Sequence, residues 1–329
     1  TIYEFNHNEY SNENFMNIIN ENNFYEIFDY RIIQKKIDDA FKIGHIGNKI
    51  GVIQSLERLN YFNTISHLRR IVDPAGDLVP IPRRRLHSTH YGCICPIESP
   101  DGGNVGLRKA LSIMTQITFG YPSKILIDFI KENGLILLED IHPSQIKSKT
   151  KVFVNGNWIG LHQHPDRLTD LLKKYRSNGL INVFTSINWD IGKNNILILT
   201  DSGRCCFPMY KVKGNRVQLE PKHIEKLKKK ELKWDNFIMG FHPKNKNFHY
   251  FDFDVKDPGK IGYKKDTLFE ELDNYGGIIE YIDSSEMDSV LIAQNIDISA
   301  TDNKPYSHCE LHPSLILGNT TLLLPFVQH

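Results

Sequence analysis

Five arginines lie close together in this 329-residue chain, and their chemistry is the most informative feature of the sequence. They are Arg69, Arg70, Arg83, Arg84 and Arg85, with Asp73 and Asp77 as the acidic residues among them. Arginine pairs bidentately with phosphate and stacks on nucleobases, so the cluster predicts a phosphate-binding surface. The intervening Pro74, Gly76 and Pro80 favour an ordered loop over a helix face. A solvated charge cluster on a surface loop is the alternative.

A tight turn follows at Pro100-Asp101-Gly102-Gly103. Glycine permits backbone conformations with φ > 0 and lets another chain or a nucleotide come close. The turn therefore presents the carboxylate of Asp101 and the amide of Asn104.

Composition and charge limit the function classes. Forty percent of the residues are hydrophobic and 24% are charged, which is typical of a globular protein with room for two or three domains. The net charge of +1 means that a nucleic-acid role must depend on local patches. No run of 18 apolar residues and no signal sequence is present, so we expect neither a membrane span nor secretion.

The cysteines indicate an intracellular, reducing compartment, because they are too few and too irregularly spaced for a disulfide framework. They are Cys93, Cys95, Cys205, Cys206 and Cys309. No pair has the C-x₂-C spacing of a structural zinc site, so no metal is predicted there.

The periodicity of apolar residues predicts short helices in residues 1–30 and two more between Arg31 and Leu68, the second around Val52–Leu56. Strand-like runs occupy residues 111–114 and 125–127. No internal repeat is present.

The pattern of residues 151–213 predicts a small α+β module. An Asn-Gly hairpin lies within 152–160, a helix spans 165–175, and segments 192–200 and 204–212 read as a second strand pair. A lysine-rich helix is expected at 222–233, and a further strand pair at 278–283 and 290–293.

Several acidic residues and histidines suggest metal sites. Asp252, Asp254 and His249 could serve a metal-dependent phosphodiesterase, although a third ligand is not evident and a solvated strand edge is the simpler interpretation. His308 and His312 are spaced i, i+4, but Pro313 interrupts the helix that such a site needs, so a structural role is favoured.

Longer motifs surround the arginines and continue along the chain. NTISHLRR (63–70) and LHSTHYGCICPIESPDGGNVGL (86–107) are followed by VFVNGNW (152–158), TDSGR (200–204), EYID (280–283), SVLIA (289–293) and SHCELHPSLILG (307–318). In this order they resemble an internal part of the second-largest, beta-type subunit of the multisubunit DNA-directed RNA polymerases. The resemblance is to the eukaryotic, archaeal and large-DNA-virus type.

The resemblance implies an α+β, multidomain fold: a helical fork region, then small mixed α/β modules and the beginning of a β-rich hybrid-binding domain. The implied divisions are 1–30 (end of a lobe-like segment), 31–140 (fork domain), 141–213 (external 2-like α+β module), 214–298 (helix, connector and following external segment) and 299–329 (truncated start of the hybrid-binding domain).

It also implies roles for individual residues. His67, Arg69, Arg70, Arg83, Arg84 and Arg85 would contact nucleic acid beside the downstream edge of the transcription bubble. Pro100, Asp101, Asn104 and Arg108 would line the wall near the RNA:DNA hybrid and the active centre. Asp101 departs from the glutamate that the family usually has. No catalytic residue and no metal ligand is expected in this chain.

The implied function is DNA-templated transcription, with this portion of a nucleotidyltransferase positioning downstream DNA and the hybrid. The implied partners are the largest polymerase subunit and other subunits, template DNA, nascent RNA and nucleoside triphosphates, with Mg²⁺ held by the largest subunit. The implied location is the nucleus, or a cytoplasmic viral factory or virion. A stand-alone nucleic-acid-binding module remains the alternative, and the phosphodiesterase is a weaker one.

Overall fold

The structure is a computed structural model of the chain, and it describes residues 24, 28–41, 45–46, 49–50, 53–73, 81–241, 272–296 and 304–327. The chain forms two compact units. We call Thr1–Arg85 with Ser99–Lys109 the arginine unit, and Leu86–Glu98 with Ala110–His329 the sheet unit. Each is described by itself.

The arginine unit is built from short elements. In order they are α3 (Tyr30–Ala40), the antiparallel pair β1 (His45–Ile46) and β2 (Lys49–Ile50), α4 (Tyr61–Leu68), β3 (Arg70–Val72), α5 (Ile81–Arg84), the 3₁₀ turn Gly102–Asn104, and β4 (Arg108–Ala110), which pairs with β3. The helix predicted around Val52–Leu56 is wrong. Helix formation starts only at Tyr61, because the Asn60 side chain accepts a hydrogen bond from the Asn63 amide and caps that end.

The first sheet of the sheet unit has the strand order β6-β8-β7-β10-β9. Its strands are β6 (Ile136–Leu137), β7 (Thr150–Val154), β8 (Asn157–His162), β9 (Ser186–Asp190) and β10 (Asn195–Leu199), and only the β7–β10 pairing is parallel. The predicted hairpin is confirmed, with Asn155 and Gly156 both at positive φ in a two-residue turn.

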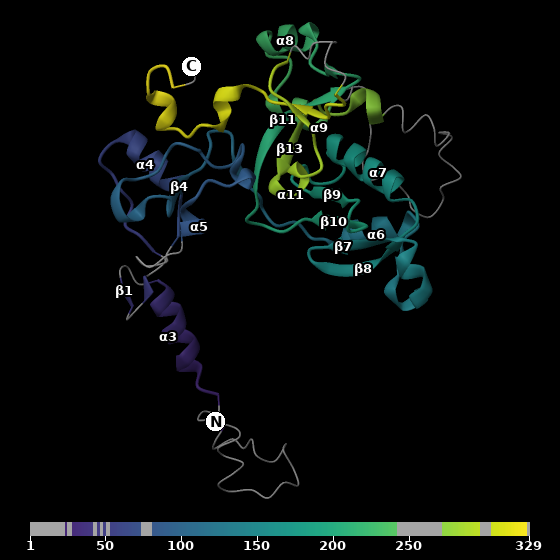
Figure 1. Cartoon of the computed structure of the whole chain (residues 1–329), viewed down its shortest axis with the longest axis horizontal. Helices are drawn as coiled ribbons and strands as arrows, with labels where there is room; N and C mark the ends of the chain where they lie inside the picture. Colours follow the sequence, from purple (N-terminus) through teal and green to yellow (C-terminus); the bar gives the residue numbers. More distant parts are fainter. Residues whose placement is uncertain are drawn as a thin grey trace, which may run out of the picture. The chain divides into compact units, whose positions relative to one another are not determined.

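Two helices, α6 (Lys124–Glu132) and α7 (Pro165–Ser177), pack on one face of this sheet (Figure 1). The buried strand residues Val152, Val154, Ile196 and Ile198 alternate and therefore share that face. The helix predicted at 165–175 is confirmed. The strand predicted at 125–127 is wrong, because Leu126 and Ile130, one helical turn apart, are the buried residues of α6.

A second sheet is organised around the long strand β11 (Cys205–Lys213). Four strands pair with it: β5 (Gln116–Ile117), β12 (Arg216–Val217), β13 (Ile279–Asp283) and β15 (His308–Cys309), which also pairs in parallel with β14 (Ile292–Ala293). Two predicted pairings are wrong. Segments 192–200 and 204–212 form strands of different sheets, and β13 and β14 pair with β11 and β15 instead of each other.

Short helices complete the sheet unit: α8 (Pro221–Lys228), α9 (Trp234–Met239) and α11 (Ser284–Met287). The lysine-rich helix is shorter than predicted, since Lys230 adopts a φ of 59° and turns the chain. No helix among the described residues is long and apolar enough to cross a membrane. The α+β prediction is confirmed.

A buried cluster of charged side chains joins the two sheets. Arg176 of α7 binds both carboxylate oxygens of Glu286 in α11 and lies 3.5 Å from Glu280 of β13. Burial alone would raise the pKa of Glu280, but Lys211, Arg176 and His308 outweigh it and hold that pKa well below the usual range. Charged residues seldom lie in a core. The sequence did not indicate this cluster, because its members come from distant parts of the chain.

Candidate nucleic-acid interface

Both ring nitrogens of His67 are occupied within the arginine unit. The Glu57 amide donates to Nδ1 at 3.0 Å, so the proton lies on Nε2, which is 3.2 Å from Oε1 of Gln54. These bonds hold residues 54–57 against the last turn of α4. His67 therefore fixes the end of α4, from which the chain continues into Arg69 and Arg70.

Arg69 and Arg70 lie at the junction of α4 and β3, and both are half-buried. The Arg70 guanidinium is 3.8 Å from the carboxylate of Glu57 and 3.4 Å from the hydroxyl of Ser66. Glu57 was missed by sequence reasoning, because nothing in its local pattern places it opposite an arginine thirteen positions later.

Arg84 acts inside the unit. Its guanidinium donates to the backbone carbonyls of Gly103 at 2.6 Å and Val105 at 2.8 Å, which fastens α5 to the turn that follows Pro100. The approach is close enough that a Cβ on Gly106 would lie 2.3 Å from the Arg84 carbonyl oxygen. Gly106 also has a φ of 73°, so this position requires glycine on two grounds.

Arg83 and Arg85 face solvent. Arg83 is 59% exposed and 3.4 Å from the carboxylate of Asp73, an ion pair of the weak, exposed kind that a phosphate can displace. Arg85 is exposed, and its guanidinium makes no hydrogen bond or ion pair with any other described residue. Beside them, Lys109 donates to the Arg83 carbonyl at 3.3 Å, which brings a further cation to the cluster that sequence reasoning missed.

The turn residues lie where the sequence predicted a presented carboxylate and amide. Asp101 caps the 3₁₀ turn by accepting from the Gly102 amide at 2.8 Å, and both Asp101 and Asn104 are exposed. Pro100 and Arg108 are half-buried, Arg108 in β4 beside β3. The exposed oxygens and nitrogens of this turn are open to hydrogen bonding with a ligand.

Two parts of the predicted sites lie outside the described residues. One is the proline-punctuated loop at 74–80, and the other is the segment with His249, Asp252 and Asp254. Within the described part of the chain, no three histidine, cysteine or acidic side chains gather closely enough to hold a metal ion. The ring of His308 lies 3.1 Å from Glu280, in the charged cluster.

Two family models match the chain. One, described as RNA polymerase Rpb2, domain 3, covers residues 54–117, and the other, described as RNA polymerase Rpb2, domain 4, covers residues 152–213. The first spans the predicted interface. The chain therefore contains domains 3 and 4 of the second-largest RNA polymerase subunit family.

Whole-protein comparisons agree with these domains. The chain is 35% identical over 291 residues to the DNA-directed RNA polymerase II subunit RPB2 of Encephalitozoon cuniculi. The aligned region covers 85% of this chain and 22% of that protein. The corresponding subunit of Schizosaccharomyces pombe is 33% identical over 86% of the chain and 24% of its own length. The DNA-directed RNA polymerase subunit 2 of Acanthamoeba polyphaga mimivirus is 26% identical over 90% of the chain and 25% of its own length.

The chain thus spans about a quarter of the length of the curated relatives that it matches. The resemblance drawn from the motifs is confirmed, including its eukaryotic, archaeal and viral character.

Proposed function

We propose that this chain serves DNA-templated transcription as part of the second-largest subunit of a DNA-directed RNA polymerase. In that role the arginine unit positions downstream DNA and the RNA:DNA hybrid beside the active centre. The residues of that active centre are assigned to other parts of the polymerase. The observation that carries the proposal is the match of residues 54–117 to domain 3, because this range contains the whole arginine cluster.

The arginines divide into two groups in this proposal. Arg70 and Arg84 hold the shape of the unit through Glu57 and through the backbone of the turn. Arg83 and Arg85, which are exposed, bind strand phosphates, and half-buried Arg69 at the end of α4 is assigned the same role. Phosphate contacts of this kind set register and affinity without reading sequence.

Pro100, Asp101, Asn104 and Arg108 form the wall near the hybrid in this proposal. Asp101 carries a negative charge that repels phosphate, so it acts on a neighbouring protein segment or on a sugar hydroxyl instead. The divisions 1–30, 31–140, 141–213, 214–298 and 299–329 are part of the same proposal.

The proposed partners are the largest subunit and further polymerase subunits, template DNA, nascent RNA and nucleoside triphosphates. The Mg²⁺ of nucleotide addition is assigned to the largest subunit, and no step of catalysis is assigned to this chain. The proposed location is intracellular: the nucleus, or a cytoplasmic viral factory or virion.

The first experiment is affinity purification of the endogenous protein, followed by mass spectrometry of its intact mass and of what accompanies it. Recovery of a largest polymerase subunit in stoichiometric amount is the expected result. Recovery of the protein without any polymerase subunit would contradict the proposal and favour a stand-alone module.

The second experiment measures binding of the purified polymerase to a bubble DNA at several salt concentrations, comparing Arg83→Ala/Arg85→Ala with the unaltered protein. The slope of log K against log salt is negative, and each lost phosphate contact reduces its magnitude by about 1. The slope of the double variant should therefore be smaller in magnitude by about 2. Arg167→Ala removes an exposed arginine of the sheet unit and is the matched control. An unchanged slope in the double variant would refute the assignment of these two arginines.

A further inference from the structure

A small pocket lies within the sheet unit, and its lining comes from residues 91–92, 114, 207–209 and 310–316. Its volume is about 20 Å³, and its lining includes Tyr91, Met114, Phe207, Met209, Glu310, His312 and Leu315. Phe207 and Met209 are alternate residues of β11, so both point to the same side of the second sheet. The rings of Tyr91 and Phe207 meet edge to face, with their centroids 6.0 Å apart.

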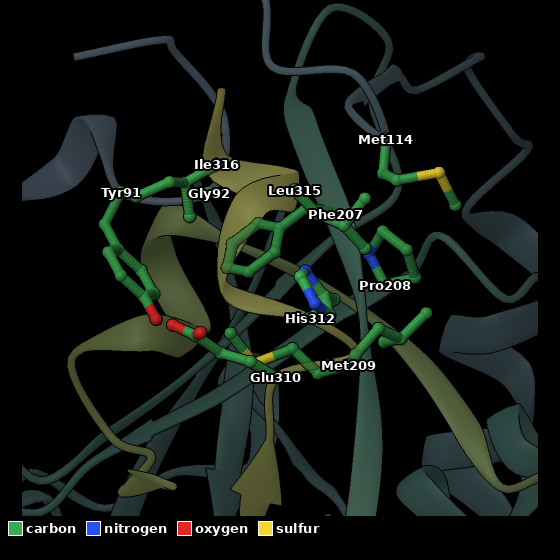
Figure 2. A pocket seen from close by; sticks show the side chains of 11 residues that line it. Tyr91, Gly92, Met114, Phe207, Pro208, Met209, Glu310, His312, Leu315 and Ile316 are labelled. Carbon is green, nitrogen blue, oxygen red and sulfur yellow. The ribbon is translucent and has the colours of Figure 1, made fainter. Parts of the chain in front are cut away.

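Glu310 is the chemically unusual wall of this pocket. The residue directly follows β15, where its amide donates to the Ala293 carbonyl at 2.9 Å. The residue is only 9% exposed, yet its carboxylate makes no hydrogen bond or ion pair with the described residues. Figure 2 shows this carboxylate and the Tyr91 hydroxyl pointing toward each other, with the His312 imidazole also lining the pocket among apolar side chains.

The other buried glutamate of the same sheet shows what Glu310 lacks. Glu280 is surrounded by Arg176, Lys211 and His308, and its pKa lies well below the usual range although burial opposes this. Burial without such cations raises the pKa of Glu310. An uncompensated buried carboxylate is costly, and a cation placed beside it would remove that cost.

We propose that this pocket binds the ammonium group of a lysine side chain on a partner protein, with Glu310 as the counter-charge. The ammonium group donates to the Glu310 carboxylate and to the Tyr91 hydroxyl. The faces of Tyr91 and Phe207 add cation–π attraction, and the methylene stem lies along Met114 and Leu315.

The size and chemistry of the pocket select this ligand. About 20 Å³ holds one water-sized group, which is the size of an ammonium head. A single carboxylate is too few ligands for Mg²⁺ or Ca²⁺, and its charge rejects phosphate. A free amine would gain only the contacts of its head and last methylene groups, whereas a lysine on a docked protein shares the binding energy of the surrounding surface.

The pocket is tested on the full chain labelled with ¹³C at the methionine methyl groups, by titration with n-butylammonium chloride and, separately, with butan-1-ol. Met114 and Met209 line the pocket, while Met239 lies in α9 and reports nonspecific effects. We expect saturable shifts of the Met114 and Met209 signals with butylammonium at neutral pH, and much smaller shifts with butanol.

Glu310→Gln keeps the size of the side chain and removes its charge. The affinity for butylammonium should fall by about tenfold or more, while the response to butanol stays the same. Equal binding of the two probes, equal binding to the variant, or no shift at Met114 and Met209 would each overturn the proposal. These measurements need no polymerase, so their failure is distinct from failure of the proposed function.

The source of the lysine is tested in the complex purified from the organism, and this step alone depends on the proposed function. A carbodiimide joins a carboxylate to an amine that it already contacts, and mass spectrometry then identifies the linked peptides. A Glu310 bond to a lysine of another polypeptide supports the proposal. A bond to a lysine of this chain, or no bond at Glu310, overturns the assignment to a partner protein.

Discussion

Replacement of Arg176 by methionine tests the charged cluster that joins the two sheets. The Arg176 side chain is 2% exposed, and its guanidinium donates to Glu286 and, at 2.7 Å, to the Thr185 carbonyl. Methionine fills a similar volume with an apolar chain. The change therefore isolates the loss of charge and hydrogen bonds from the creation of a large cavity.

The expected cost is large because two buried carboxylates lose a shared cation. In the variant Glu286, which is 2% exposed, keeps the hydrogen bond from the Ile187 amide. Glu280 keeps its ion pairs with Lys211 and His308. Removing one partner of a buried ion pair destabilises by about 3–5 kcal/mol. For a unit of this size that corresponds to a fall in melting temperature of roughly 6–20 °C.

The cost should depend on pH with a definite sign. The pKa of Glu280 is lower in the folded state than in the unfolded chain, so its ionisation stabilises the fold above the unfolded pKa and this stabilisation is lost as pH falls through the folded pKa. Without Arg176 the Glu280 carboxylate accepts a proton at higher pH. The difference between variant and parent is therefore largest near neutral pH and decreases toward about pH 4.

The assay is urea unfolding followed by tryptophan fluorescence at neutral and acidic pH. Trp158, Trp189 and Trp234 all belong to the sheet unit, so the signal reports the unit that contains the cluster. Lys193→Met breaks an exposed ion pair with Asp190 and should leave the midpoint unchanged. A loss below about 1 kcal/mol, or the same loss at both pH values, would refute this account of the cluster.

Further predictions concern a turn and the buried thiols. Gly106→Ala should destabilise the arginine unit by about 1–3 kcal/mol and weaken hydrogen-exchange protection in the turn, because its Cβ would meet the Arg84 backbone. Gly103→Ala is the matched control, since a Cβ there has no atom within 4 Å. Equal effects of the two substitutions would contradict this prediction. Burial raises the pKa of Cys206 to about 12 and that of Cys93 further, so neither should react with a disulfide reagent near pH 8 until urea unfolds the sheet unit. Rapid native labelling of either cysteine would show that the thiol is reachable.

Local patterns predicted the elements whose signals are complete within a short segment. The Asn155-Gly156 turn and the Pro165 helix start are such cases, since turn chemistry and helix capping act over a few residues. The failed predictions concern pairing between distant segments. Strand β11 could not be assigned to a sheet from its own sequence, because its partners come from residues 116–117, 216–217, 279–283 and 308–309.

The interface shows the same division. The cluster of arginines and the turn at Pro100 were evident from residue types alone. Which arginines are exposed was not, because Arg84 and Arg85 are neighbours in sequence, yet one binds the backbone of a turn and the other faces solvent. The roles of Glu57 and Lys109 depend on contacts across ten or more residues.

The sequence by itself determined the family of this protein, its α+β class and the presence of its arginine cluster, because ordered motifs and local periodicity are properties of the chain. It did not determine the elements that carry the arginines, since Arg70 lies in β3 and Arg83 and Arg84 lie in α5 rather than in a loop. Only the tertiary structure decided how charge is distributed in the interior. Arg176 meets Glu280 and Glu286 from a position about a hundred residues earlier in the chain, and Glu310 is buried without an ion-pair partner among the described residues. The energy of a buried charge depends on its neighbours in space, and folding alone brings those neighbours together.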